Sequence, residues 1–432
     1  MKKIFLIVLV SMLVFTACDN DLEQIPPNIA SPDSLTDFTG VLNGAYYYQT
    51  AAGTPLSVMG EYRADNTQFD ESPHISFAAF NGDVLTMEGD FFQPFYANLY
   101  KSILSANNVI ENSANSTQVA EAKFLRGLAY LNLVKVFGDV PINLSASPST
   151  SDTSILVRKS VADVYGQIIT DLSDAMSNLD NSGIATGRAS KIAAQGLLGR
   201  AYVYMGDYVS AEPYLRDVVN GAAGAGISLQ ANFADIFGND LNSEILYSTQ
   251  ISGAITAGSG TVFAFWFGGN DSKGDDFPIT NSLVNAFDAA GDVTRKNVTI
   301  NRTSAVRVVG TKFNSGDQDF IDLRLGDAIL LYAEALNENG STPAAITQLN
   351  KIRSRANLAN TTAVTQATVR TAIANERRLE LALEGQRFFD LVRTGTLDAA
   401  MGKTISSNYH VFPLPTSEIF ASGEVITQNA GY

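Results

Sequence analysis

The sequence predicts a predominantly α-helical protein whose helical hairpins stack into a tetratricopeptide-like superhelix. Apolar residues recur at three- and four-residue spacing along most of the chain, as they do in amphipathic helices. One hairpin pattern occurs in residues 198–218 and again 134 residues later. Residues 221–322 lose this periodicity and become rich in Gly, Ser, Asn, Asp and aromatic residues. Because long loops on a helical scaffold usually carry function or disorder, this irregular, partly β-stranded insertion is a candidate functional segment.

The N-terminal segment has the features of an export signal. Lys2 and Lys3 precede an apolar run over residues 4–15, which is shorter than the roughly 20 residues that span a bilayer. Ala17 and the lone Cys18 follow, as in a bacterial lipobox, where the cysteine is lipidated and becomes the mature N-terminus. The alternative is ordinary signal cleavage with Cys18 incidental. We expect a signal peptide at 1–17 and lipidation at Cys18, because exported chains rarely keep one unpaired thiol.

Helix boundaries follow from capping residues, glycines and prolines. Ser34 and Ser160 are candidate N-caps, and Gly138 ends a helix shortly before Pro141. The predicted helices cover residues 34–50, 91–112, 118–137, 160–179, 189–205, 208–220, 323–339, 342–356 and 365–394, the last as one long helix or a helix pair. Strand-like runs lie at 245–251 and 305–309. We expect one compact domain after the signal, with an acidic, proline-containing tether at 18–30, helical regions at 31–220 and 323–432, and the insertion at 221–322.

The repeated hairpin carries small residues at matching positions. Gly199 and Ala211 in the first copy correspond to Ala333 and Ala345 in the second, and Gly127 begins a partial third copy. Small side chains allow two helices to pack closely. A single pair cannot bury its apolar face alone, so neighbouring pairs must stack.

Composition excludes several classes of function. The 432 residues include 29 Lys and Arg against 44 Asp and Glu, a formal net charge of −15, whereas nucleic-acid binding needs a basic surface. One Cys and two His exclude a disulfide within the chain and a Cys/His zinc site. The acidic groups near Asp271 and Asp319 lack EF-hand spacing. We therefore expect no cofactor, no bound metal and no nucleic-acid partner.

The helical segment 376–393 combines several carboxylates and guanidinium groups. Glu376, Glu380, Glu384 and Arg387 lie three or four residues apart and can pair along one face. The alternative is a carboxylate pair for glycoside hydrolysis. The interleaved arginines favour structural ion pairs over a carboxyl group with a raised pKa. Asp327 and Glu334 share a helix face in the same way, and Arg324 and Arg353 are their expected partners.

Two segments combine aromatic faces with polar groups, which is what sugar binding requires. In residues 261–277 the candidate ligand contacts are Phe265, Trp266, Asn270 and Asp271. In residues 61–80 they are Tyr62, Arg63, Asp65, Asn66, Phe69, His74 and Phe77. The alternative for the aromatic residues is packing in the core, which is the commoner role of such side chains. His74 is interpreted as a loop residue, because no second His or Cys lies near it in sequence.

Several long motifs resemble the SusD/RagB family. They are residues 123–142 (KFLRGLAYLNLVKVFGDVPI), 323–340 (LRLGDAILLYAEALNENG), 350–353 (NKIR), 376–395 (ERRLELALEGQRFFDLVRTG) and the C-terminal VFPLPTSEI and ITQNAGY. The chain departs from the family at Phe91-Phe92, where Trp is frequent, and at Ala430, where Pro is frequent. The resemblance implies a surface-exposed outer-membrane lipoprotein that is not an enzyme. It also implies that the segments near 61–80 and in the long loop contribute to the ligand face.

The resemblance further implies a function in nutrient uptake. Proteins of this family bind oligosaccharide or polysaccharide and deliver it to a partner SusC-like, TonB-dependent transporter in the outer membrane. The alternatives are a peptide-binding uptake lipoprotein of the same fold, a glycoside hydrolase, and a tetratricopeptide scaffold that binds no small ligand. A ligand cleft poor in stacked aromatics would favour peptide, and the single Trp keeps that alternative open.

Overall fold

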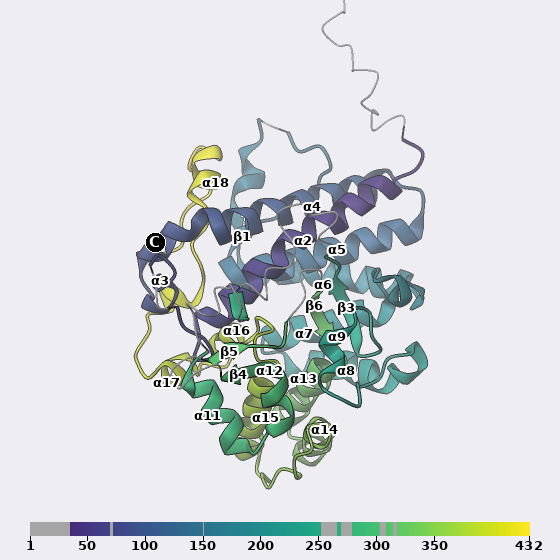
Figure 1. The fold of residues 1–432 in the computed structure, drawn as a ribbon. Coiled ribbons are helices and arrows are strands. Elements are labelled where there is room, and N and C mark those ends of the chain that lie inside the picture. Colours follow the sequence, from purple (N-terminus) through teal and green to yellow (C-terminus); the bar gives the residue numbers. More distant parts are fainter. Residues whose placement is uncertain are drawn as a thin grey trace, which may run out of the picture. The chain divides into compact units, whose positions relative to one another are not determined.

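A computed structural model describes residues 35–69, 72–149, 151–251, 266–268, 279–302, 308–313 and 318–432. Cys18, Phe265, Asn270 and Asp271 lie outside these residues. Thr39–Tyr432 form one compact unit, separate from Met1–Phe38. This unit is predominantly helical, which confirms the predicted fold class (Figure 1). Within the described ranges, none of the helices is both long enough and apolar enough to cross a membrane.

The main helices follow the predicted order, with two more, at 281–290 and 293–299, inside the insertion that was predicted to be irregular and partly β-stranded. They are α2 (Thr39–Tyr62), α4 (Gln93–Asn112), α5 (Ser116–Phe137), α6 (Val161–Asn178), α7 (Lys191–Tyr204), α8 (Tyr208–Gly221), α11 (Asn281–Ala290), α12 (Val293–Thr299), α13 (Leu325–Glu338), α14 (Thr342–Arg355), α15 (Gln366–Glu380) and α16 (Arg387–Arg393). Shorter turns of helix are α3 (Ser76–Ala79), α9 (Asp235–Gly238), α17 (Leu397–Met401), α18 (Thr416–Ala421), the 3₁₀ segments η3 (Gly82–Met87), η5 (Thr153–Leu156), η6 (Ser182–Thr186), η7 (Ala223–Ala225) and η9 (Ser407–His410), and the π-helical η4 (Glu88–Phe92).

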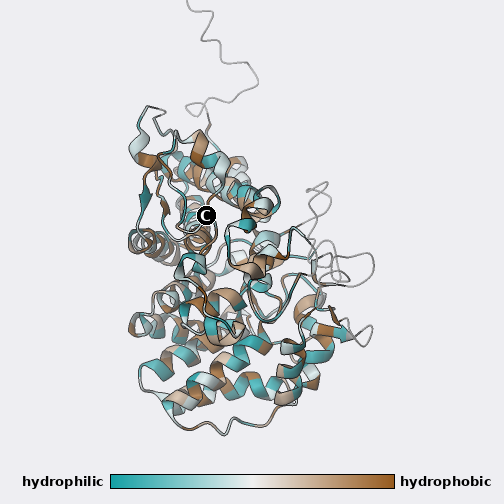
Figure 2. Cartoon of the chain, turned by 90° about the vertical axis from the view of Figure 1, so that its left-hand side faces the viewer, coloured by the Kyte–Doolittle hydropathy of each residue, from teal (hydrophilic) through white to brown (hydrophobic). Residues whose placement is uncertain are grey.

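Consecutive helices pack against one another as a stack of hairpins. Contacts join α2 to α4, α4 to α5, α5 to α6, α6 to α7, α7 to α8, α8 to α13, and α13 to both α14 and α15. The small residues of the repeat lie at the crossings, because a Cβ on Gly127 would be 3.0 Å from Leu172 Cγ and one on Gly199 would be 2.5 Å from Leu215 Cγ. Apolar and polar segments alternate along these helices, as expected for helices that bury one side (Figure 2).

Some predicted helix boundaries were wrong, and residues 365–394 form the second of the two alternatives that the sequence left open. Helix α2 continues to Tyr62 through Pro55, past the predicted end at residue 50, because all but one of residues 52–62 are buried and packing outweighs the proline penalty. The segment 365–394 is a helix pair, since α15 ends at Glu380 and the chain turns with Gly385 at φ 73° before α16. The predicted helix at 323 begins at Leu325, because the two preceding residues belong to a strand.

Six short strands form three antiparallel pairs in the described residues: β1 (Val140–Pro141) with β2 (Arg158–Lys159), β3 (Ile245–Thr249) with β6 (Phe320–Arg324), and β4 (Ile300–Arg302) with β5 (Val308–Gly310). In the β3–β6 pair Ile245 faces Arg324 and Thr249 faces Phe320. Thr249 and Phe320 therefore lie side by side at the ends of the two strands. Of the strand-like run 305–309, residues 308 and 309 lie in β5 and the rest lie outside the described residues.

Buried ion pairs connect the second half of the chain. The guanidinium of Arg324 donates to Glu244, Glu380 and Glu384, and all four side chains are at most 5% exposed. Arg295, also buried, contacts Glu376 and Glu380. Attraction to these cations outweighs desolvation and holds the pKa of Glu380 and Glu384 below the usual range. The interpretation of these carboxylates as structural ion pairs is confirmed.

The predicted pairing partners were wrong. Asp327 pairs with Arg200 and Arg377, and Glu334 pairs with Arg393. The expected partner Arg353 binds Glu376 instead. Arg387 does not pair along its own helix face either, because the turn at 381–386 separates it from α15 and places it beside Asp65. Pairs across the stack therefore replace the pairs within one helix that sequence spacing allows.

Glu61 near the end of α2 is a buried carboxyl with a raised pKa. It accepts hydrogen bonds from Asn66 Nδ2 at 2.9 Å and from the Gly385 N–H at 3.0 Å. Burial raises its pKa to about 7, although Asn66, Lys312 and the N–H groups of Leu383 and Gly385 oppose the shift. The folded state therefore binds this proton more tightly than the unfolded state. The stability that Glu61 contributes is complete below its unfolded pKa and is lost as pH rises through 7.

We expect Glu61→Gln, which mimics the protonated carboxyl, to gain in stability over the parent protein as pH rises. The difference in unfolding free energy between variant and parent should grow by roughly 2 kcal/mol from pH 5 to pH 8. Urea unfolding of both proteins at the two pH values measures it. Taking the difference cancels other titrating groups, including His410, whose pKa burial lowers. A difference that stays constant with pH would contradict the protonation of Glu61.

Candidate functional site

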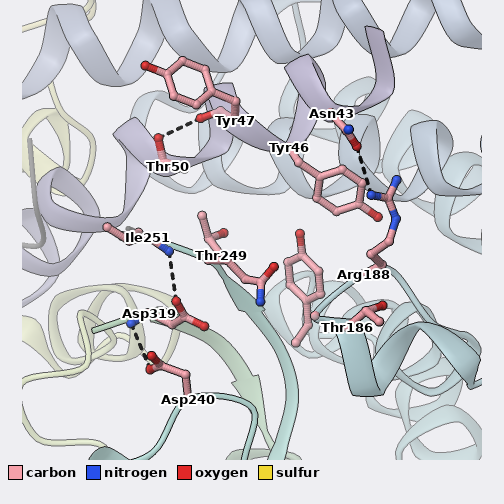
Figure 3. Close-up of a pocket in the computed structure, with 13 residues that line it drawn as sticks. Asn43, Tyr46, Tyr47, Thr50, Thr186, Arg188, Asp240, Thr249, Ile251 and Asp319 are labelled. Carbon is pink, nitrogen blue, oxygen red and sulfur yellow. Dashed lines mark hydrogen bonds between the residues drawn. The ribbon is translucent and has the colours of Figure 1, made fainter. Parts of the chain in front are cut away.

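A cavity of about 740 Å³ opens between α2, the turn after η6 and strand β3 (Figure 3). It falls within the range of about 300–1,000 Å³ that is usual for small-molecule sites. Its lining combines three tyrosines with amide, hydroxyl, guanidinium and carboxylate groups. The residues are Asn43, Tyr46, Tyr47, Thr50, Thr186, Gly187, Arg188, Asp240, Tyr247, Thr249, Gln250, Ile251 and Asp319.

A glycine turn shapes one side of the cavity. Gly187 follows η6 at φ 67°, in the left-handed region that favours glycine. A Cβ at this position would lie 2.5 Å from the side chain of Gln250, at the end of β3. Glycine therefore suits this turn through its left-handed backbone conformation, and it leaves room for the Gln250 amide, which a larger residue would force to rotate away. This turn presents Arg188 to the cavity.

Tyr46 and Arg188 form a fixed polar cluster on that side. The Tyr46 hydroxyl donates to Glu121 at 2.6 Å and accepts from the Ala189 N–H at 2.9 Å. The Arg188 guanidinium lies 4.5 Å from the Tyr46 ring centroid and donates to Glu121 at 2.7 Å and to Asn43 at 3.0 Å. Burial raises the pKa of Tyr46 well above its usual value, so its hydroxyl stays neutral. These contacts fix the orientation of the aromatic ring.

Two carboxylates form the opposite side, as Figure 3 shows. Asp319 accepts hydrogen bonds from the Ile251 N–H at 2.9 Å and from Ser248 Oγ at 3.0 Å. Its own N–H donates to Asp240 Oδ1 at 3.3 Å. Burial raises the pKa of Asp319 to about 6, with the nearby Asp240 charge adding to the effect. Asp319 is therefore still ionised above pH 7, while Asp240 is exposed to solvent.

This combination suits recognition of a hydroxylated ligand. Tyrosine rings offer flat apolar faces, and the amide, hydroxyl and carboxylate groups offer hydrogen bonds. In the part of the chain that the structure describes, no three His, Cys, Asp or Glu side chains gather as a metal site would require.

The aromatic residues predicted as ligand contacts lie elsewhere, near the end of α2. The Tyr62 ring stacks on Phe69 with centroids 3.7 Å apart, and the Tyr62 hydroxyl donates to the Trp266 carbonyl. The Trp266 ring packs against His74 at 5.4 Å and Phe91 at 5.2 Å. The structure thus brings Tyr62, Phe69, His74, Phe77 and Trp266 into one cluster, each at most 9% exposed. Contact between this cluster and a ligand stays a prediction.

The predicted polar contacts at 63–66 have partners within the protein. Arg63 is fully buried, lies 4.4 Å from the Phe412 ring centroid and donates to the Tyr432 hydroxyl at 2.6 Å. Asp65 pairs with Arg378 and Arg387. Asn66 donates to Glu61 and accepts from Arg378. These groups join α2 to the C-terminal region, and their contact with a ligand also stays a prediction.

Sequence reasoning did not select the residues of the cavity as ligand contacts. Its wall comes from residues 43–50, 186–188, 240, 247–251 and 319, which the fold brings together. The one local signal is the run of three tyrosines at 46–48, and such a run is equally compatible with packing in the core.

Comparison with known proteins identifies two matching families. The one described as "SusD family" matches residues 279–409, and "Starch-binding associating with outer membrane" matches residues 18–203. SusD-like protein P2 of Formosa agariphila is 24% identical over the whole of both chains. The starch-binding protein SusD of Bacteroides thetaiotaomicron is 25% identical over 77% of this chain and 76% of its own length. The name of this second relative describes a binding protein.

Solved structures share the fold over almost the whole chain. A laminarin-binding SusD-like protein superimposes with a TM-score of 0.74 and 25% identity, covering 92% of this chain and 99% of its own. The surface glycan-binding protein A of Bacteroides fluxus has a TM-score of 0.75 at 20% identity, covering 91% and 99%. The second likeness shows the fold alone.

Proposed function

Since the chain is a SusD-like protein, we propose that it binds oligosaccharide or polysaccharide at the outer membrane and delivers it to a TonB-dependent, SusC-like transporter. The protein is held at the cell surface by lipid on Cys18, which follows the export signal. It acts by binding and not by catalysis. Incorporation of labelled palmitate that disappears in Cys18→Ala would support the anchor.

The observation that carries this proposal is the cavity beside β3. Tyr46 is held rigid by Glu121, Ala189 and Arg188, so its ring loses little conformational freedom when a sugar contacts it. Tyr47, on the same helix, is 47% exposed to solvent, and Gln250 is exposed at the end of β3. A rigid aromatic wall with exposed polar groups at its edge is the arrangement that captures a flexible, hydroxyl-rich chain.

We expect the double variant Tyr47→Ala/Gln250→Ala to weaken glycan binding at least tenfold. The change removes one aromatic face, worth about 1 kcal/mol, and one amide hydrogen bond, also worth about 1 kcal/mol. The measurement is affinity gel electrophoresis of residues 19–432 on a panel of soluble polysaccharides, followed by calorimetric titration on the glycan that retards the protein. The matched control is Tyr48→Ala, which removes a neighbouring tyrosine of α2 that does not line the cavity.

The same panel compares the cavity with the aromatic cluster around Trp266. Trp266→Phe keeps an aromatic ring in the packed cluster and should leave binding unchanged if the ligand lies in the cavity. Loss of binding in Trp266→Phe with no effect of the cavity variant would move the site to the cluster. A parent protein that binds no polysaccharide but is retarded by peptide would overturn the glycan assignment and favour the peptide-binding alternative.

A further inference from the structure

Negative charges outnumber positive charges among the described residues that line the cavity. Among the described residues that line it, Arg188 is the one basic side chain. The positive charge of Arg188 is balanced by Glu121, which accepts a hydrogen bond from the guanidinium at 2.7 Å. Glu121 is buried, with 8% of the residue exposed. A ligand that approaches Arg188 therefore meets an ion pair and not a free cation. The guanidinium can still donate to a hydroxyl, but it supplies little net attraction for an anion.

The two carboxylates on the opposite side are not offset in this way. Asp319 is 6% exposed, and its hydrogen-bond donors, the Ile251 N–H and Ser248 Oγ, carry no charge. Asp240 is exposed and accepts from the Asp319 N–H. With Arg188 cancelled by Glu121, the cavity holds a net charge of two negative units above pH 7. The acidic character of the whole chain, −15 formally, adds to this local field.

We propose that this cavity accepts neutral glycan segments and excludes anionic ones, and that Asp240 and Asp319 determine this selectivity. The inference rests on the function proposed above and adds the substrate class: hydroxyl-bearing sugars without uronate or sulfate groups. A carboxylate or sulfate that enters the cavity would lose water and face two like charges, and among the described lining residues the one cation, Arg188, is already paired with Glu121. A neutral sugar can instead donate its hydroxyl protons to the same carboxylates.

Electrostatic magnitudes support a measurable effect. Two unit charges a few ångströms apart repel by about 1 kcal/mol in water and by about 4 kcal/mol in the weaker screening near a protein surface. Two such repulsions inside the cavity predict at least a tenfold loss of affinity for an anionic derivative. Salt screens charges over about 10 Å at 0.1 M and about 3 Å at 1 M, so high salt should reduce the exclusion only in part.

The test uses pairs of polysaccharides that differ only in charge. Starch, laminarin, xylan and dextran would each be compared with their own carboxymethyl derivative at pH 7.5, in low and high salt. The parent protein should bind one neutral polymer and bind its derivative at least tenfold more weakly. Asp240→Asn/Asp319→Asn should recover most of the derivative's loss, although it should bind the neutral polymer somewhat more weakly because it lacks two charged acceptors. Asparagine keeps an oxygen that can accept the Ile251 N–H, and the exposed Asp240→Asn alone should recover part of the loss.

The control variant separates a cavity effect from net charge. Asp90→Asn/Asp217→Asn neutralises two exposed carboxylates that do not line the cavity, and it should not admit the derivative. Equal recovery in both double variants, or a parent protein that binds neutral and anionic polymers equally well, would overturn the proposed selectivity while leaving glycan binding intact. Failure to bind any polymer of either kind would instead contradict the proposed function itself.

Discussion

Arg324→Met is expected to cost about 3–5 kcal/mol of unfolding free energy, enough to leave little folded protein at 37 °C. The guanidinium of Arg324 is 1% exposed and lies between Glu244, Glu380 and Glu384, at 2.9, 2.6 and 2.8 Å. Removing this guanidinium leaves the three buried carboxylates with fewer positive charges to balance their negative charges. Methionine fills much of the space but cannot donate a hydrogen bond. Guanidinium unfolding, or yield and thermal unfolding where the variant is too unstable, measures the loss.

The matched control for this prediction is Arg216→Met. Arg216 pairs with Asp217 at 2.9 Å, but its side chain is 47% exposed and that of Asp217 is 51% exposed. Exposed pairs contribute about 0–1 kcal/mol, so this variant should unfold almost as the parent does. Adding Glu384→Gln to Arg324→Met should recover part of the loss, because it removes one of the unpaired charges. Similar stability of Arg324→Met and Arg216→Met would show that the buried network does not hold this region together.

Gly60→Ala is expected to destabilise the protein by about 3 kcal/mol or more. A Cβ at Gly60 would lie 2.1 Å from the carbonyl oxygen of Gly385 and 2.7 Å from its Cα. These are backbone atoms in the turn between α15 and α16, so no side-chain rotation relieves the overlap. Either α2 or the turn must move, which would also disturb the hydrogen bond from the Gly385 N–H to Glu61. Urea unfolding measures the change.

Gly44→Ala on the same helix provides the control. The atom nearest to a Cβ at Gly44 is Ser105 Oγ at 3.9 Å, an ordinary van der Waals contact. Alanine favours the helix over glycine by about 1 kcal/mol, so this variant should be as stable as the parent or more so. If the two alanine variants have the same stability, α2 and Gly385 do not approach each other as closely as the structure shows.

Sequence alone was sufficient for the helices because their periodicity and caps are local. Residues 160–179 were predicted as a helix and form α6 over 161–178, with Ser160 accepting from the Asp163 N–H as its cap. The small residues Gly127 and Gly199 indicate close helix packing through their positions in the repeat alone. The course of α2 beyond residue 50 was missed because Pro55 argues against a helix locally. Burial in the tertiary structure outweighs that local signal.

Partners that lie far apart in sequence could not be predicted. The Gly60–Gly385 contact joins residues on two distant segments, and nothing near either glycine indicates the other. The charges of α15 were correctly interpreted as ion pairs, but the sequence could not assign Arg324 to its acids, because several buried acids compete for it. The cavity was missed for the same reason. Tyr46, Arg188 and Asp319 line one cavity only because three separate segments meet.

The pairing of β3 with β6 has a consequence for how such proteins diverge. Because Thr249 faces Phe320, the excursion between them begins and ends at one seam on the helical stack. Doubling the length of a flexible loop costs only about 0.6 kcal/mol in closure entropy. Mutation can therefore lengthen or shorten the residues next to this seam, while Arg295 and Lys312, farther along the same stretch, stay fixed by their buried ion pairs. Gln250, Ile251 and Asp319 lie directly at the seam and line the cavity, so each such change in sequence also changes the shape of the cavity on that side.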